Sequence, residues 1–249
     1  MASVKSIYGY LYDSYGTQGW WPLSGLGMPV NKDDKDWPNY LKANPKGNKD
    51  DFIKNWPRHL GIAPKSWKQR FEIIVGAILT QNTSWSNVEK AIYTLNKNKL
   101  IDAEKIKKVD QKKLGGLIMP AGYFNQKSRK LKECAQFFSK NNDFDREEVL
   151  KIWGVGPETA DSILLYAFGK PYFVVDAYTK RILGRAGFKE KSYDDIQGLF
   201  MANVDDSVDM YKEYHALIVE HGKSVCLKSR PRCGSCPIAE VCKSRDSFK

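Results

Sequence analysis

The chain has 249 residues, 42% of them apolar, which is enough for one large or two modest domains with filled cores. Its 40 Lys and Arg residues outnumber 29 Asp and Glu residues and give a formal charge of +11, which favours a nucleic-acid partner without excluding a soluble protein that is merely basic. Apolar runs stay well short of the ~18 residues that cross a bilayer, and the N-terminus lacks the apolar stretch of a signal peptide, so we expect a cytoplasmic protein with no membrane partner.

The first quarter of the chain is rich in tryptophan and then in turn-forming residues. Five of the seven tryptophans lie in the first 67 residues, more than a core there should need, so some are candidates for lining a ligand pocket. Residues 23–66 are polar and contain five prolines. This composition predicts a long irregular segment with little helix.

From residue 68 onward the apolar residues recur at three-and-four spacing, which is the pattern of helices with one buried face. Phe71, Ile74 and Ile78 illustrate it within the first of these helices. Period-two alternation is almost absent, so we predict an all-α fold. The expected helices are 68–80, 85–96, 101–107, 110–117, 126–140, 145–152, 157–168, 177–186, 191–203 and 207–223.

A glycine-rich corner joins two of these helices. Gly154, Val155 and Gly156 follow the helix at 145–152, and Pro157 stands where the first turn of the next helix begins. Two helices joined so tightly form a hairpin, and the N–H groups at the second helix start suit an anion such as a DNA phosphate. On its own, this pattern is weak evidence for a DNA contact and favours a plain turn.

An aspartate follows the second helix of the hairpin. Asp176 comes after two valines and directly before the helix at 177–186. In isolation, an aspartate at this position is interpreted as a helix cap.

Four of the five cysteines lie near the end of the chain. Cys226, Cys233, Cys236 and Cys242 have the spacing C-x6-C-x2-C-x5-C, and four thiolates within seventeen residues can converge on one metal centre. Zinc usually takes two short cysteine knuckles, whereas a [4Fe–4S] cluster is bound by four cysteines with uneven spacing. We therefore predict a [4Fe–4S] cluster, with zinc as the alternative, and interpret Cys134 as a small buried residue.

The hairpin LKIWGVGPETA, the stretch VVDAYTKRIL and the cysteine tail occur in an order that resembles the endonuclease III branch of the helix-hairpin-helix DNA glycosylases. The resemblance covers residues 66–249. It implies an all-α, two-lobed fold with a C-terminal [4Fe–4S] cluster loop, one lobe at 67–170 and the other formed by 1–66 plus 171–249. It also implies that Asp176 is catalytic, that the glycine turn binds phosphate and that the four tail cysteines hold the cluster.

Glu158 departs from the pattern of the bifunctional enzymes in this branch. They have a lysine here, whose amine attacks the sugar and forms an imine, which glutamate cannot do. We therefore expect a monofunctional glycosylase, in which Asp176 orients or deprotonates a water and stabilises the charged sugar. Lys170 or Lys180 could in principle substitute for the missing amine, so lyase activity stays open.

Three further stretches resemble the 3-methyladenine glycosylase subgroup, also called methylpurine glycosylase II. They are WWP at 20–22, LTQNTSW at 79–85 and AGYFNQKSRKL at 121–131. An alkylated purine carries positive charge, and an indole face attracts a cation by ~1–2 kcal/mol. The alternative is that both indoles belong to the core. The predicted lesion pocket comprises Trp20, Trp21, Pro22 and Glu158.

Other polar residues are expected to contact DNA. Gln81 or Asn82 would fill the gap that a flipped base leaves in the stack, and a second polar turn at 125–127 would contact the opposite strand. The alternatives are an amide that closes a helix and a solvated face. The predicted DNA contacts are Gly154, Val155, Gly156, Thr159, Gln81, Asn82, Asn125, Gln126 and Lys127.

These features favour a monomeric, monofunctional DNA glycosylase of base excision repair that hydrolyses the N-glycosidic bond of flipped-out alkylated purines. Its partner would be double-stranded DNA containing a damaged base, which would associate it with the nucleoid. The alternative within the same class is removal of uracil, mismatched thymine or an oxidised base, with AP lyase activity. The alternative from another class is a non-catalytic protein that recognises DNA damage.

Overall fold

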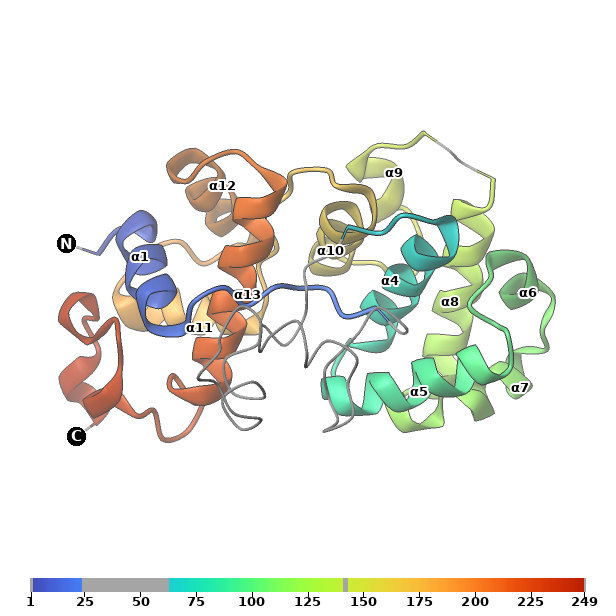
Figure 1. Cartoon of the computed structure of the whole chain (residues 1–249), viewed down its shortest axis with the longest axis horizontal. Coiled ribbons are helices and arrows are strands. Elements are labelled where there is room, and N and C mark those ends of the chain that lie inside the picture. Colours follow the sequence, from blue (N-terminus) through green and yellow to red (C-terminus); the bar gives the residue numbers. More distant parts are fainter. Residues whose placement is uncertain (1, 24–62, 141–142, 249) are drawn as a thin grey trace, which may run out of the picture. The chain divides into compact units, whose positions relative to one another are not determined.

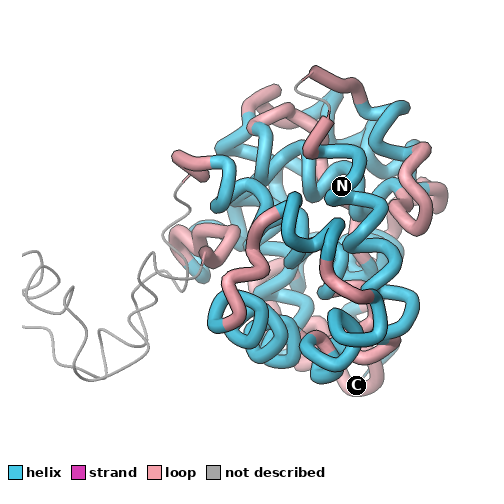
Figure 2. The backbone as a smooth tube through the Cα atoms, turned by 90° about the vertical axis from the view of Figure 1, so that its right-hand side faces the viewer, coloured by secondary structure: helices cyan, strands magenta, loops and turns pink. Residues whose placement is uncertain are grey.

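The computed structural model describes residues 2–23, 63–140 and 143–248, and every regular element within these ranges is a helix. Figures 1 and 2 show the helices and the loops that join them, with no strand in the described part of the chain. The predicted all-α class is confirmed. The irregular segment predicted at 23–66 lies outside the described residues, except for residue 23 and residues 63–66. None of the described helices is long and apolar enough to cross a membrane.

The helix bounds agree with the sequence to within two residues at each end for all ten predicted helices. The elements are α1 (Val4–Tyr15), α4 (Trp67–Leu79), α5 (Trp85–Lys97), α6 (Ala103–Lys108), α7 (Gln111–Leu117), the 3-10 turn η1 (Met119–Ala121), α8 (Phe124–Phe138), α9 (Arg146–Leu150), α10 (Pro157–Phe168), α11 (Ala177–Ala186), α12 (Tyr193–Asn203), α13 (Val208–Ser224), and the 3-10 turns η2 (Cys233–Ser235), η3 (Ala239–Val241) and η4 (Arg245–Phe248).

Helix α1 was not predicted. Ser3 caps its N-terminus and forms a reciprocal capping box with Ser6, which satisfies backbone donors that would otherwise have no partner. Val4, Ile7 and Leu11 are buried along one face at three-and-four spacing. The signals for a helix were therefore present, but the aromatic residues between them obscured the pattern.

The chain divides into two compact units. One spans Ala63–Lys170 and is called the hairpin unit here; the described residues of the other, the terminal unit, are 2–23 and 171–248. The two units are described separately below.

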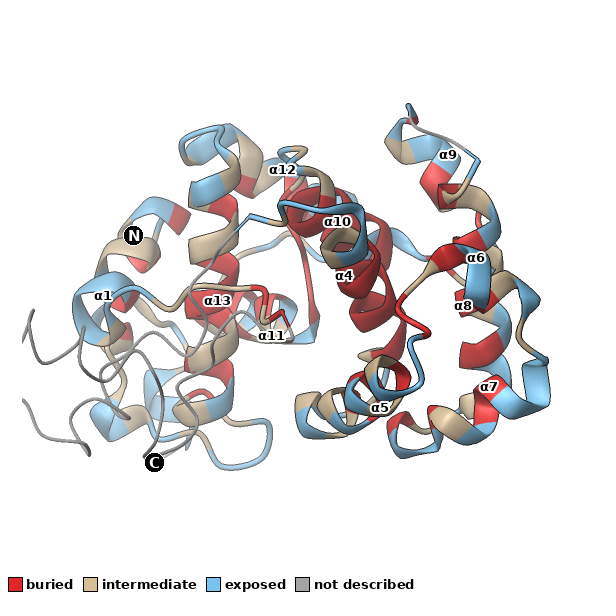
Figure 3. Cartoon of the chain, turned by 45° about the vertical axis from the view of Figure 1, so that its right-hand side comes forward, coloured by how far each residue is buried: buried red, intermediate tan, exposed pale blue. Residues whose placement is uncertain are grey.

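The core of the hairpin unit is built on α4 and α10, which pack against each other. Every residue from Phe71 to Leu79 is buried, and so is every residue from Thr159 to Ala167 (Figure 3). A helix that is buried on all sides is typical of the centre of a helical domain. The shorter α6 and α7 pack against α8.

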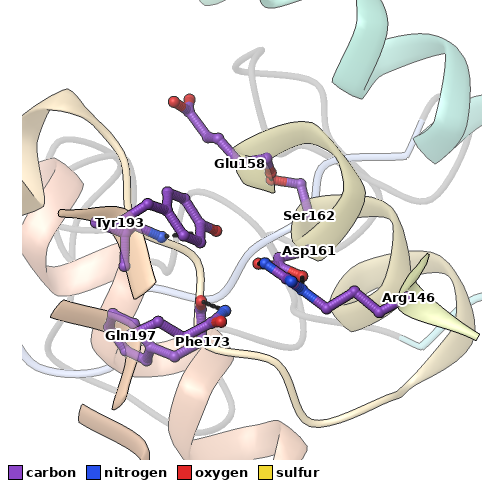
Figure 4. A network of polar contacts seen from close by, with 8 residues as sticks. Arg146, Glu158, Asp161, Ser162, Phe173, Tyr193 and Gln197 are labelled. Atoms are coloured by element: carbon purple, nitrogen blue, oxygen red, sulfur yellow. Dashed lines mark hydrogen bonds and ion pairs between the residues drawn. The ribbon is translucent and has the colours of Figure 1, made fainter. Parts of the chain in front are cut away.

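The core of the terminal unit surrounds α13, which packs against α1 and α11. The rings of Phe173 and Phe200 stack with centroids 3.9 Å apart. The hydroxyl of Tyr214 donates to the carbonyl of Val4 at 2.5 Å, and the amide of Gln197 donates to the carbonyl of Phe173 at 2.7 Å (Figure 4). The first contact joins α13 to α1, and the second fixes the segment that leads into α11.

Candidate functional site

The turn between α9 and α10 has the tight geometry that the sequence predicts. Gly154 has φ of 83°, a conformation that favours glycine, and a Cβ there would come within 2.6 Å of the Lys130 side chain. Gly156 is the N-cap of α10 and provides no side chain to cap it. The first turn of α10 thus begins without a side-chain cap, as an anion site requires.

Val155 lies between the two glycines of the turn, and its contact with DNA stays a prediction. Its side chain is buried in the hairpin unit, and its N–H donates to the carbonyl of Ile152 at 3.0 Å. The turn needs an apolar anchor here because the two glycines that flank it provide no packing.

A buried ion pair joins the two helices of the hairpin. The Arg146 guanidinium donates from Nε to Oδ1 of Asp161 at 2.7 Å and from Nη2 to Oδ2 at 3.0 Å (Figure 4). The Asp161 side chain is completely buried in the middle of α10, and Arg146 is 21% exposed. This bidentate contact fixes α9 against α10.

Gln81 is engaged by the hairpin and is therefore a poor candidate for filling a gap in the base stack. Its Nε2 donates to the carbonyl of Gly154 at 3.2 Å and to the hydroxyl of Thr159 at 2.9 Å, and its Oε1 accepts from Lys130 Nζ at 2.6 Å. Thr159 is itself buried, and its contact with DNA stays a prediction. Asn82, the alternative, is exposed and has φ of 53°.

Lys127 does not lie on a polar surface. Its ammonium group is buried and donates to the carbonyls of Leu79 and Ala121, at 2.8 Å each. Burial, with a smaller contribution from Lys130, lowers the pKa of Lys127 to about 8. The side chain satisfies carbonyl groups at the end of α4 and in η1. Its contact with DNA stays a prediction. Asn125 and Gln126 beside it are exposed, as a DNA contact would require.

Asp176 caps α11 through only one of its two carboxylate oxygens. Its Oδ1 accepts from the N–H and the hydroxyl of Thr179, at 2.7 Å and 2.8 Å, whereas Oδ2 lies 3.7 Å from Nε2 of His215. Burial raises the pKa of the carboxyl group, but His215 and the two hydrogen bonds from Thr179 outweigh burial and leave the pKa of Asp176 below its usual value. The residue is therefore a buried, ionised carboxylate.

The WWP stretch lies in the terminal unit. Trp21 is buried, while Trp20 and Pro22 are half-buried. The two indoles meet edge to face at 5.7 Å, and the ammonium group of Lys223 lies 5.7 Å from the centroid of the Trp20 ring. Glu158, the remaining pocket candidate, is exposed in the first turn of α10 (Figure 4). The lesion pocket stays a prediction.

The four tail cysteines line one pocket in the terminal unit. All four are free thiols, and burial, with a contribution from the other three cysteines, raises the pKa of Cys236 to about 11. Nη1 of Arg185 lies 3.3 Å from the Cys226 sulfur, and Nε2 of His221 lies 3.8 Å from that of Cys236. Among the described residues, no three His, Cys, Asp or Glu side chains are arranged around a common metal position. A pocket of four thiols next to positive charge nevertheless fits a cluster of iron and sulfide.

Two residues that take part in these contacts were not identified from the sequence. Lys130 belongs to the hairpin network, and His215 faces Asp176 from another helix. Lys130 lies within the AGYFNQKSRKL stretch and His215 in none of the motifs above, but the partners of both are far away along the chain. Only an amphipathic pattern that directs each side chain inward could have suggested them.

The family model described as HhH-GPD superfamily base excision DNA repair protein matches residues 75–205. The chain belongs to this superfamily. A provisionally named DNA repair glycosylase of Methanocaldococcus jannaschii is 41% identical and aligns with 97% of this chain and 96% of its own length. Endonuclease III of Sulfolobus acidocaldarius is 31% identical over 70% of this chain and 81% of its own length.

Solved structures of HhH-GPD proteins are similar to this one. The H. pylori 3-methyladenine DNA glycosylase MagIII, bound to 1,N6-ethenoadenine, has a TM-score of 0.58 and 29% identity and covers 74% of this chain and 96% of its own. A non-covalent endonuclease III–DNA complex has a TM-score of 0.68 and 19% identity and covers 99% of this chain and 98% of its own, which shows the shared fold. The resemblance seen in the sequence is confirmed, and this HhH-GPD protein is a DNA glycosylase of base excision repair.

Proposed function

We propose that this HhH-GPD protein is a monofunctional glycosylase that hydrolyses the N-glycosidic bond of alkylated purines in double-stranded DNA, with Asp176 as the catalytic carboxylate. The observation that carries the proposal is the state of Asp176, a buried carboxylate held ionised with only Oδ1 engaged in the helix cap. The sugar becomes positively charged as the base leaves. A fixed negative charge in a site of low water content stabilises that transition state and can accept a proton from the attacking water.

The residue at the first turn of α10 supports hydrolysis rather than imine formation. Glu158 has no amine. The two candidate lysines, Lys170 and Lys180, make other contacts. Lys170 donates to the carbonyl of Phe144 and lies 4.8 Å from the centroid of its ring. Lys180 lies 5.9 Å from the centroid of the Tyr193 ring. A water molecule is therefore the proposed nucleophile.

The similarity to MagIII supports an alkylated purine as the substrate. MagIII is a 3-methyladenine DNA glycosylase, and its identity to this chain is 29%. In the terminal unit, the half-buried ring of Trp20 already holds an ammonium group 5.7 Å from its centroid. The same aromatic face suits a purine that carries delocalised positive charge. Trp21 and Pro22, in the same unit, belong to the same proposed pocket.

A second candidate function follows from the identity of 31% to endonuclease III of Sulfolobus acidocaldarius. It is excision of a neutral base, which could be uracil, mismatched thymine or an oxidised base, coupled to strand cleavage. A lysine amine would then be required in the site.

We also propose that Cys226, Cys233, Cys236 and Cys242 hold a [4Fe–4S] cluster. The support is their common pocket and the match to proteins named endonuclease III. When bound, such a cluster cross-links the cysteine tail and fixes its basic loops. Arg185 and His221 would then lie against ligand sulfurs, where positive charge and N–H groups stabilise thiolates.

The proposed DNA contacts use residues of the hairpin unit that are exposed or half-buried. The phosphate would bind at the start of α10, through the backbone of the turn that includes Gly154 and Gly156. Asn82 would enter the stack from which the base is flipped, since Gln81 is engaged within the unit. Asn125 and Gln126 would contact the opposite strand.

The proposal is tested by base release from a panel of duplexes that carry 3-methyladenine, 7-methylguanine, uracil, thymine opposite guanine, or 8-oxoguanine. Release of the two alkylated purines is expected, and Asp176→Asn should lower it by roughly 10²-fold or more. Asparagine is also a good helix cap, so this variant should keep its stability. Asp102→Asn is the matched control, because Asp102 caps α6 in the same way.

Two outcomes would contradict the proposal. If a neutral lesion is released and alkylated purines are not, the assignment of the substrate is wrong. A covalent adduct trapped by borohydride on an abasic duplex would show an amine nucleophile and favour the endonuclease III type of reaction.

A further inference from the structure

His215 lies near Oδ2 of Asp176, the carboxylate oxygen that does not take part in the helix cap. It comes from the middle of α13, which packs against α11, and its side chain is 9% exposed. Its Nε2 is 3.7 Å from Oδ2, slightly longer than a hydrogen bond but within the range of an ion pair. Contacts in a catalytic site are often long in the absence of substrate and shorten when it binds.

We propose that His215 is a positioning residue, which holds the Asp176 carboxylate in one orientation and balances its negative charge during base release. This inference rests on the proposed function, because it assumes that Asp176 acts on the sugar and on water. His215 itself touches neither. It completes a carboxylate whose two oxygens are held from two different helices.

The groups that face the Asp176 carboxylate explain why a second partner is needed. On its own helix, Thr179 donates two hydrogen bonds to Oδ1, and Tyr178 has a pKa that burial and the nearby Asp176 charge both raise. From α13 the facing group is His215. The Thr179 donors fix one oxygen only, so without the imidazole the carboxylate could rotate about that oxygen.

The alternative is that His215 only fills space in the core. A purely structural role would change stability, with no effect on the pH at which base release is lost. A positioning role has a different signature. Because His215 lowers the pKa of Asp176, its removal raises that pKa, and the acid limb of the pH–rate profile should move to higher pH.

The experiment compares the full-length wild type, His215→Ala and His215→Gln in single-turnover base release as a function of pH. The substrate is the duplex of the panel that the wild type cleaves fastest. We expect His215→Ala to lower the plateau rate by about tenfold or more, to shift the acid limb upward and to leave the affinity for an abasic duplex unchanged. Glutamine retains an N–H donor without charge, so it should recover part of the rate while its acid limb stays shifted.

Tyr211→Phe is the matched control. Tyr211 lies one turn earlier on α13 and is buried, but its hydroxyl donates to Asp206 at 3.0 Å and not to Asp176. This variant should keep the wild-type rate and acid limb. A titration of the Asp176 carboxyl by carbon-13 NMR, assigned with Asp176→Asn, provides a readout that does not depend on any lesion.

The outcomes separate this inference from the proposed function. If Asp176→Asn abolishes base release while both His215 variants keep the wild-type rate and acid limb, the positioning role is wrong and the proposed function stands. If Asp176→Asn leaves base release intact, the proposed function fails. An unchanged Asp176 titration in folded His215→Gln would also overturn the inference.

Discussion

The ion pair between Arg146 and Asp161 should be the most sensitive polar contact of the hairpin. Arg146→Ala removes both hydrogen bonds, of 2.7 Å and 3.0 Å, and leaves a completely buried carboxylate in the middle of α10. Breaking a buried pair by removing one partner costs about 3–5 kcal/mol, because the remaining charge keeps its desolvation penalty. For a chain of this length, that loss lowers the melting temperature by roughly 10 °C.

The assay is urea unfolding followed by far-ultraviolet circular dichroism, with the wild type, Arg146→Ala and the double variant Arg146→Met with Asp161→Leu. The double variant removes both charges and should be close to the wild type in its free energy of unfolding. Glu133→Ala is the control for an ordinary ion pair, since Glu133 is 44% exposed and lies 3.8 Å from Arg129. It should lose less than about 1 kcal/mol.

The reasoning would be refuted if Arg146→Ala cost no more than Glu133→Ala. It would also be refuted if the double variant were less stable than the single variant, because the penalty would then arise from lost packing and not from the unpaired carboxylate.

Three further predictions concern the turn, the buried lysine and the cysteines. Gly154→Ala should lower the free energy of unfolding by about 1–3 kcal/mol in urea unfolding and weaken DNA binding. The reason is that Gly154 has φ of 83° and that a Cβ there would lie 2.6 Å from a neighbouring side chain. A Cβ at Gly156 has open space around it, so Gly156→Ala should be nearly neutral. The pKa of Lys127 is about 8 in the folded protein and 10.5 ordinarily, so between these pH values the unfolded chain binds more protons than the folded one. The stability of the wild type should therefore rise with pH across this window, relative to that of Lys127→Met. Cys236→Ser should lose iron and visible absorbance in the purified protein, whereas Cys134→Ala, which changes a buried cysteine of α8, should keep both.

The helices could be predicted from the sequence because their signal is local. The three-and-four spacing of apolar residues and the capping residues depend only on neighbours along the chain, and they located helix ends to within two residues. Helix α1 carries the same signals at Val4, Ile7 and Leu11, so its omission was an error of interpretation. The glycine turn, with Gly154 in the left-handed region, was predictable for the same reason.

The contacts that complete the site could not be predicted because their partners are distant in the chain. Gln81 bonds to a carbonyl 73 residues away, and Lys127 reaches one 48 residues away. In the sequence, both residues occupy polar turns, where exposure is the default expectation. Only the packing of α4, α8 and the hairpin reveals that a buried ammonium and a half-buried amide connect these segments. Burial of such groups is tolerated because every one of these contacts satisfies a backbone or side-chain partner.

For Asp176, the helix cap and the proposed catalytic role, which the sequence left as alternatives, are compatible. A helix cap uses one carboxylate oxygen, and here Thr179 provides both donors to Oδ1. The N-terminus of α11 also places positive partial charge beside the carboxylate, which favours its ionised form although it is buried. Capping therefore fixes the position and charge of the group without using Oδ2, the oxygen that faces His215. An aspartate that caps a helix is for this reason a better catalyst than a free one, because its orientation is already restricted and less entropy is lost on reaching the transition state.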